Sequence, residues 1–148
     1  MDWQQNLITN DKDILELARS SHRVAVLGIR SEKRADRAAF YVPQYLASAG
    51  VEVVPVPVYE KDVEIILGQK VYRDLISVPG EIDLVDVFRR SEDIPPHLPD
   101  ILAKKPKSVW LQLGIRNDAA AEELARAGIK VVQDRCLMVE HRRSRTLG

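Results

Sequence analysis

The chain has 148 residues, of which 45% are hydrophobic and 30% charged, and its 22 basic and 22 acidic residues leave no net charge. This length fits one domain, residues 1–148, with a core that needs neither disulfides nor a structural metal. Balanced charge argues against nucleic-acid and membrane binding, and the single cysteine, Cys136, excludes an intrachain disulfide. Neither a membrane-spanning run nor a secretion signal appears, so we expect a cytoplasmic protein.

Apolar stretches of strand length alternate with stretches of helical period along the chain. The predicted strands cover residues 23–28, 51 to about 54, 83–87, 108–111 and 129–132. The predicted helices cover residues 11–20, 37–49, 91–105, 117–127 and about 136 onward. The first of them belongs to an N-terminal segment, residues 1–21, that is expected to pack on the rest of the domain. Such alternation predicts an α/β fold with a doubly wound, parallel, five-stranded Rossmann-like sheet and helices on both faces.

Prolines set two of the expected boundaries. Pro55 and Pro57 lie just after the start of the second strand. Because proline has no N–H to donate to a ladder, we expect strand pairing to fade near Val54. Pro95 and Pro96 are expected in the first turn of the helix over residues 91–105, where a missing N–H does no harm.

The loop after the first strand has the form of a phosphate cradle. A strand, a tight turn at Gly28 and a helix start would direct unpaired N–H groups outward. The dinucleotide motif G-x-G-x-x-G is absent, because charged residues, including Arg30, follow where two more glycines would stand. The loop therefore predicts an anionic ligand other than NAD, with Arg30 and Ser31 at the surface.

Arginines follow four of the predicted strands, at Arg30, Arg89, Arg116 and Arg135. The carboxyl ends of parallel strands meet at one edge of the sheet, where ligands of doubly wound folds bind. Guanidinium groups suit phosphate, because the planar fork donates two parallel hydrogen bonds and stays charged. Taken singly, each arginine would equally be solvated or paired with an acidic neighbour. The cluster as a whole predicts a phosphate-bearing ligand.

Four segments carry a family resemblance: "VAVLGIRSEKRADRAAFYVPQYLASAGVEVVPV", "DVFRR", "VWLQLGIRN" and "DRCLMVEH". Together they resemble the family of small stand-alone CoA-binding proteins, whose Rossmann-like domain is similar to the N-terminal domain of the succinyl-CoA synthetase α subunit. The match extends over nearly the whole chain after His22. It departs after the second strand, where relatives usually read "VNP" and this chain reads "VPV".

The resemblance implies that CoA or acyl-CoA lies across the strand ends. Its phosphates would lie at Gly28, Ile29, Arg30 and Ser31, and its adenosine end would face Val56 and the loop toward Lys61. Its pantetheine arm would lie at Phe88, Arg89, Gln112 and Gly114. We add Arg34, Arg37 and Arg116 as basic residues expected near the ligand. The departure at "VPV" falls in the segment that the resemblance implies for contact with the adenosine end.

Catalysis is not expected, because ligases of the resembling superfamily take their histidine from outside this domain. No Walker loop, G-x-S-x-G elbow or metal-ligand spacing appears. Two alternatives stay open. One is an NAD(P)-binding oxidoreductase-like domain, in which Glu60 alone would fill the acidic ribose-binding position. The other is a redox or regulatory protein that uses Cys136, next to Arg135 at a helix start. An unidentified protein partner stays open as well, and the sequence does not indicate the oligomeric state.

Overall fold

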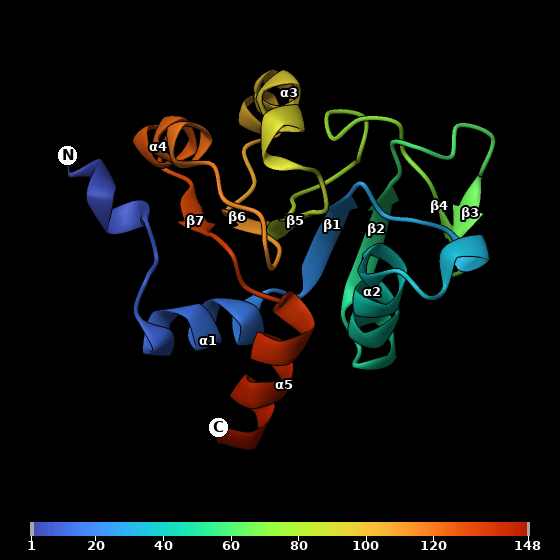
Figure 1. The fold of residues 1–148 in the computed structure, drawn as a ribbon, viewed down its shortest axis with the longest axis horizontal. Coiled ribbons are helices and arrows are strands. Elements are labelled where there is room, and N and C mark those ends of the chain that lie inside the picture. The colour runs from blue at the N-terminus through green and yellow to red at the C-terminus, as the bar shows by residue number, and fades with distance from the viewer. Residues whose placement is uncertain (1, 148) are drawn as a thin grey trace.

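The computed structural model describes residues 2–147 and is built around a parallel sheet of five strands (Figure 1). The strands follow the order β2-β1-β5-β6-β7, and every neighbouring pair is parallel. Their bounds are Arg23–Leu27 for β1, Glu52–Val56 for β2, Leu84–Val87 for β5, Ser108–Leu111 for β6 and Lys130–Val132 for β7. The prediction of a five-stranded, parallel, Rossmann-like sheet is confirmed.

Helices cover both faces of the sheet. In Figure 1, α1 (Asp11–Ser20), α2 (Ala38–Ser48) and α5 (Leu137–Leu147) lie below it, and α3 (Leu98–Lys104) and α4 (Asp118–Arg126) lie above it. The short 3₁₀ turns are η1 (Trp3–Asn6), η2 (Glu32–Arg34), η3 (Ser91–Asp93) and η4 (Pro95–His97). The N-terminal helix α1 packs beside α5 and is capped by the side chain of Asn10, which accepts from the N–H of Asp13 at 2.9 Å.

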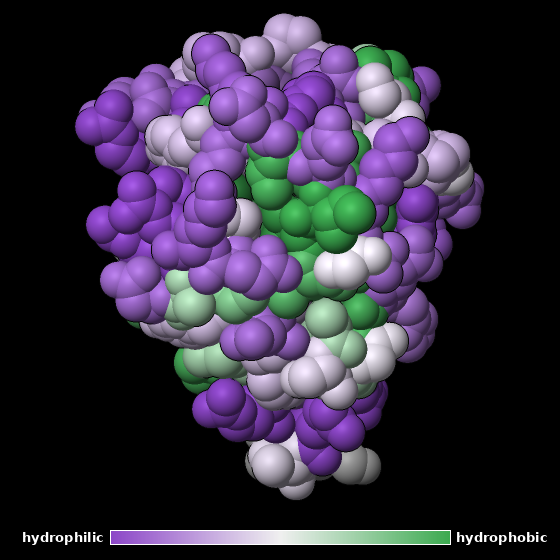
Figure 2. Space-filling view, turned by 90° about the vertical axis from the view of Figure 1, so that its right-hand side faces the viewer, coloured by the Kyte–Doolittle hydropathy of each residue, from purple (hydrophilic) through white to green (hydrophobic). Residues whose placement is uncertain are grey.

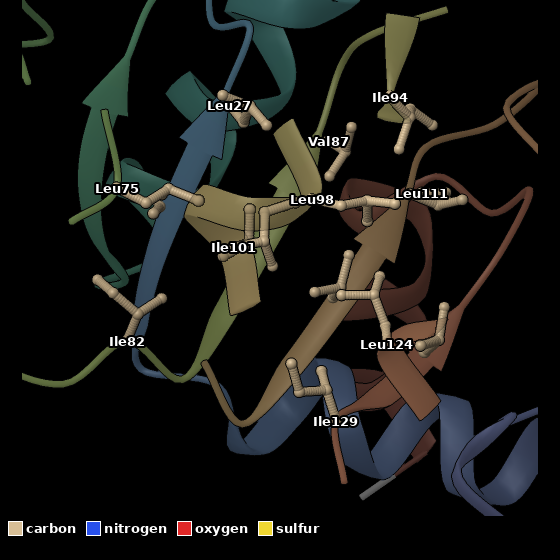
Figure 3. Packing of buried hydrophobic residues seen from close by; sticks show 14 of the residues in the cluster. Leu27, Leu75, Ile82, Val87, Ile94, Leu98, Ile101, Leu111, Leu124 and Ile129 are labelled. Carbon is tan, nitrogen blue, oxygen red and sulfur yellow. The ribbon is translucent and has the colours of Figure 1, made fainter. Parts of the chain in front are cut away.

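Each face of the sheet has its own buried cluster, because strand residues alternate between the two sides. The cluster under α3 and α4, drawn in Figure 3, includes Leu27, Val87, Leu98, Ile101, Leu111 and Leu124. The cluster on the face of α1, α2 and α5 includes Ile14, Val26, Phe40, Trp110 and Leu137. The two layers of apolar side chains fix the sheet between the helices.

The expectation that pairing of the second strand fades near Val54 is wrong. β2 continues to Val56, and Pro55 is in register with Val26 of β1. β2 is an edge strand, and the carbonyl of Pro55 accepts from the N–H of Tyr72 on the side away from β1. Because backbone groups of one residue point to the same side, the missing N–H of Pro55 faces outward and removes no ladder bond.

The segment over residues 91–105 forms no single helix. The turns η3 and η4 precede α3, so Pro95 and Pro96 stand in η4 instead of the first turn of the α-helix. Two adjacent residues without N–H groups cannot supply successive bonds of an α-helix, and the chain makes tighter turns before α3 begins at Leu98.

A two-stranded hairpin, β3 (Ile65–Ile66) and β4 (Gln69–Lys70), lies beside β2 and was absent from the sequence-based expectation. Ile66 is fully buried, whereas Ile65 is 62% exposed. Figure 2 faces this side of the molecule and shows an apolar patch surrounded by hydrophilic residues. None of the helices over residues 2–147 is both long enough and apolar enough to span a bilayer.

Candidate functional site

The winding direction of the sheet reverses between β1 and β5, because β2 lies on one side of β1 and the later strands lie on the other. At their carboxyl ends a cleft of about 530 Å³ opens, which we call the β1/β5 cleft. This is where a doubly wound fold separates its loops and binds ligands. Of the sequence-predicted site residues, the cleft brings together Gly28, Arg30, Arg37, Phe88, Arg89 and Gly114.

Gly28 forms the floor of the cleft for a steric reason. Its φ is +88°, and a Cβ at this position would lie less than 3.0 Å from the carbonyl oxygen of Phe88. The N–H of Phe88 donates to Leu27 at 2.8 Å, so the loops after β1 and β5 run in direct backbone contact. The N–H of Gly28 itself donates to the carbonyl of Val56 at 2.9 Å. Gly28 therefore allows the two loops to approach each other.

Four arginines line the β1/β5 cleft, and they differ in their partners. Arg30 pairs with Glu60 at 3.2 Å, and Arg90 pairs with Asp93 at 3.0 Å. Arg37 and Arg89 have no acidic partner among residues 2–147. Of the four, these two are the guanidinium groups that no carboxylate in the described part of the chain pairs with.

The start of α2 adds backbone donors to the same cleft. Arg37 is the N-cap residue, and its side chain makes no capping hydrogen bond. Ala38 and Ala39, the first two residues of the 11-residue helix, line the cleft. N–H groups of a first helical turn have no acceptor within the helix, and the helix dipole places partial positive charge there. Together with Arg37 and Arg89, this end of α2 suits an anion.

The loop after β1 has already used its donors inside the protein. The N–H of Arg30 donates to the carbonyl of Ala39 at 3.1 Å. The N–H of Ser31 donates to Glu60 at 2.9 Å, and the hydroxyl of Ser31 donates to the same carboxylate. The expectation that Ser31 lies at the surface is wrong: it is 4% exposed, because Glu60 folds back over it.

The remaining sequence-predicted residues lie away from the cleft. Ile29 and Val56 are buried in the core, and Gln112 is buried with its carbonyl oxygen accepting from the N–H of Leu137 at 2.9 Å. Gln112 thus fixes the start of α5 and does not line the β1/β5 cleft. Arg34 lies exposed on η2.

Two further basic residues line other hollows. Lys61 lies in one formed with the β3–β4 hairpin. Arg116 lies in one between the N-terminal segment and α4 and pairs with Asp118 at 3.1 Å. The predicted basic cluster is therefore divided. Arg30 and Arg89 share the β1/β5 cleft, whereas Arg135 and Arg116 share the hollow beside α4.

The prediction did not include several residues that line the cleft, namely Ala38, Ala39, Tyr59, Arg90, Ser91, Glu92 and Ile115. Ala38 and Ala39 were detectable in principle, since a helix start after the first strand of such a fold faces the ligand crevice. Tyr59 lies in the loop from Val56 toward Lys61 that the resemblance implies for the adenosine end, but no local pattern singled it out. The guanidinium groups of Arg30 and Arg89 lie over its ring, 4.8 Å and 5.0 Å from the ring centre.

No histidine or cysteine among the described residues lines the β1/β5 cleft. His97 accepts a hydrogen bond from Arg89, and His141 is bonded to the hydroxyl of Tyr45 at 2.9 Å on the other face. Cys136 is half-buried against the cluster that contains Trp110. Within residues 2–147, no three His, Cys, Asp or Glu side chains gather as a metal site would require.

Several known proteins are similar to this chain over most of its length. The model of the CoA binding domain family matches residues 22–142. Protein YneT of Bacillus subtilis (strain 168) is 34% identical over 129 residues, which are 87% of this chain and 92% of YneT. The structure of cell-free ID.343 from Thermus thermophilus is 38% identical, with a TM-score of 0.83, over 92% of this chain and 99% of that one.

A hypothetical protein from Pyrococcus horikoshii OT3 is 31% identical, with a TM-score of 0.82, over 95% of this chain and 94% of that one. The family-model match over residues 22–142 spans all five strands of the sheet and the loops that form the β1/β5 cleft. The chain therefore belongs to the CoA binding domain family.

Proposed function

We propose that the protein is a binding module for CoA or acyl-CoA, which holds the ligand in the β1/β5 cleft and does not transform it. The observation that carries this proposal is the pair Arg37 and Arg89, which face the cleft without an acidic partner in residues 2–147. CoA carries a diphosphate and a ribose phosphate, and a phosphomonoester alone holds about −1.5 to −2 charges at pH 7. Membership of the CoA binding domain family supports this choice of ligand.

The diphosphate would lie at the start of α2. There it would accept from the N–H groups of Ala38 and Ala39 and from the guanidinium groups of Arg37 and Arg89. Charge-assisted hydrogen bonds of this kind are about twice as strong as neutral ones. This position differs from the one implied by the resemblance, at the backbone of Gly28 to Ser31, where the donors of Gly28, Arg30 and Ser31 have partners inside the protein.

The pantetheine arm would run along the apolar side of the cleft. Half-buried Phe88 and Ile115 lie there, on either side of the gap between the ends of β5 and β6. Tyr59, which is 48% exposed and also lines the cleft, would contact the adenosine end of the ligand. Apolar walls with a few convergent polar groups are typical of cofactor sites.

Binding without catalysis is supported by the groups that line the cleft. Its serine and its glutamate both contact other groups of the protein. Ser91 donates to the carbonyl of Arg116 at 2.7 Å, and Glu92 lies 3.8 Å from Arg90. Neither forms the pair of nucleophile and base that acyl transfer needs.

Calorimetric titration of CoA into the purified protein tests this proposal. We expect Arg37→Ala and Arg89→Ala to weaken CoA binding, and the matched variant Arg19→Ala, an exposed arginine on α1, to bind as the wild type does. NADH in place of CoA distinguishes the oxidoreductase alternative, since tighter binding of NADH would contradict the proposal. Release of free CoA from acetyl-CoA during incubation would contradict the absence of catalysis.

A further inference from the structure

Glu60 reaches from the end of β2 to the loop after β1. Its carboxylate accepts from the N–H of Ser31 at 2.9 Å, from the hydroxyl of Ser31, and from Nε of Arg30 at 3.2 Å. A backbone N–H, a hydroxyl and a guanidinium are the donors that bind a phosphate in proteins. The carboxylate of Glu60 therefore occupies a place that is built for an anion.

The chain around Glu60 is held in this position. The ring of Tyr59 lies against the guanidinium groups of Arg30 and Arg89. On the other side, Arg73 donates to the carbonyl of Glu60 at 3.1 Å and to the carbonyl of Val63. These contacts hold the segment of residues 59–63 in place, so that the carboxylate of Glu60 stays at Ser31 beside the β1/β5 cleft.

The carboxylate carries its charge at neutral pH. Burial by itself would raise the pKa of Glu60, but the hydrogen bonds from Ser31 and Arg30 and the charge of Arg30 outweigh burial and lower this pKa below its usual value. A ligand phosphate that approaches Ser31 would meet a negative charge, and it would find the donors already taken.

We propose that Glu60 is an internal competitor for the anion position formed by Ser31 and Arg30, which a ligand phosphate reaches only after the Glu60 carboxylate has left. This inference rests on the proposed CoA binding. It accounts for two facts together: the resemblance implies phosphate at the loop from Gly28 to Ser31, and Glu60 occupies the donors of that loop. With Glu60 in place, only the start of α2 is open to phosphate. Once Glu60 leaves, Arg30 and Ser31 join Arg37 and Arg89 around the ligand.

The variant Glu60→Gln tests this competition, because glutamine keeps the size of the side chain and removes its charge. We expect it to tighten both CoA and inorganic pyrophosphate by about tenfold, the size of one charge-assisted hydrogen bond. Glu16→Gln is the matched control. It removes one exposed carboxylate that pairs with Arg19 on α1, outside the lining of the β1/β5 cleft. We expect a change of less than about twofold for this control, the size of an exposed ion pair.

A double variant separates competition from a general change of charge. Ser31→Ala, added to Glu60→Gln, removes the hydroxyl for which Glu60 and the ligand compete, and we expect most of the gain to be lost. Because Ser31 is buried, thermal unfolding of each variant is measured alongside, and affinities are compared below the onset of unfolding.

Each other outcome is decisive. Weaker CoA binding by Glu60→Gln would make Glu60 a ligand contact and overturn the competition. An equal gain in Glu16→Gln would also overturn it, because the gain would then follow from net charge alone. Unchanged affinity for both probes in Glu60→Gln would also overturn it. If CoA binds to none of the variants, the proposed function fails. Pyrophosphate then still decides about Glu60, since a gain in Glu60→Gln supports the competition and no gain overturns it.

Discussion

Nε of Arg89 donates a hydrogen bond to Nε2 of His97 at 3.1 Å, which joins the β1/β5 cleft to η4. An imidazole nitrogen accepts a hydrogen bond only when it carries no proton. Burial lowers the pKa of His97, and the charge of Arg89 lowers it further, against the weaker opposing effect of Asp100 and Asp93. Neutral His97 therefore positions Arg89 at pH 7.

We expect CoA affinity to fall when the pH drops through the pKa of His97, which lies below the ordinary histidine value of about 6.5 in the folded protein. The pKa of His97 is lowered on folding, so the contribution of the neutral form is complete above that pH and is lost as the pH falls. His97→Gln retains an acceptor but cannot titrate. Calorimetry at pH 7.5 and 5.5 on both proteins cancels the ionisation of the ligand itself. Equal losses of affinity in the two proteins would show that His97 does not position Arg89.

Gly28→Ala should destabilise the fold strongly. The positive φ alone costs a residue with a Cβ about 1–2 kcal/mol. The new methyl group would also press on the carbonyl of Phe88, and overpacking of this kind costs about 1–3 kcal/mol more. Gly50→Ala is the matched control, since Gly50 has a φ of +94° and open space around it. Urea unfolding of both variants measures the difference, and equal losses would mean that the two loops move apart freely.

The sequence predicted the sheet and the edge that carries the cleft, because apolar periodicity and charges after strands are local patterns. Contacts between segments that are far apart in the chain could not be predicted from these local patterns. Glu60 lies 29 residues from Ser31, and their contact depends on how the chain folds back after β2. Likewise, the direction of the missing N–H of Pro55 depends on β2 being an edge strand with Tyr72 on its open side.

Asp86 shows the same limit in the core. The sequence pattern correctly predicted that Asp86 lies in a strand. It did not predict that Val26 and Trp110 lie beside Asp86 in the sheet. Asp86 is fully buried, and neither carboxylate oxygen has a hydrogen-bond partner in the described part of the chain. Removal from water raises the pKa of Asp86 well above its ordinary value, so the folded protein keeps this side chain protonated.

The free energy of unfolding should consequently carry a pH dependence that Asp86→Asn removes. In the unfolded chain the carboxyl loses its proton near pH 4, whereas in the folded chain it keeps the proton to a much higher pH. The contribution of Asp86 to the free energy of unfolding is therefore largest at low pH. It decreases as the pH rises, by up to about 1.4 kcal/mol per pH unit. Urea unfolding at pH 5 and 7 measures this in both proteins. The prediction fails if the wild type minus variant difference is the same at both values.

Phe88 should separate CoA from simpler nucleotides. Its half-buried ring follows β5 and lines the β1/β5 cleft on the side of Ile115. The pantetheine arm is a flexible aliphatic chain with two amides, and an apolar wall would stabilise it by removing its methylene groups from water. ADP has no such arm and gains nothing from this wall.

Phe88→Ala should therefore weaken CoA by about 1–2 kcal/mol, the scale of lost apolar burial, and leave ADP affinity nearly unchanged. Calorimetry with both ligands on both proteins gives a double difference, in which any general loosening of the cleft cancels. Because the backbone of Phe88 contacts Gly28, thermal unfolding of the variant is compared with that of the wild type. Equal losses for CoA and ADP would show that the arm does not pass Phe88, even in a protein that binds CoA.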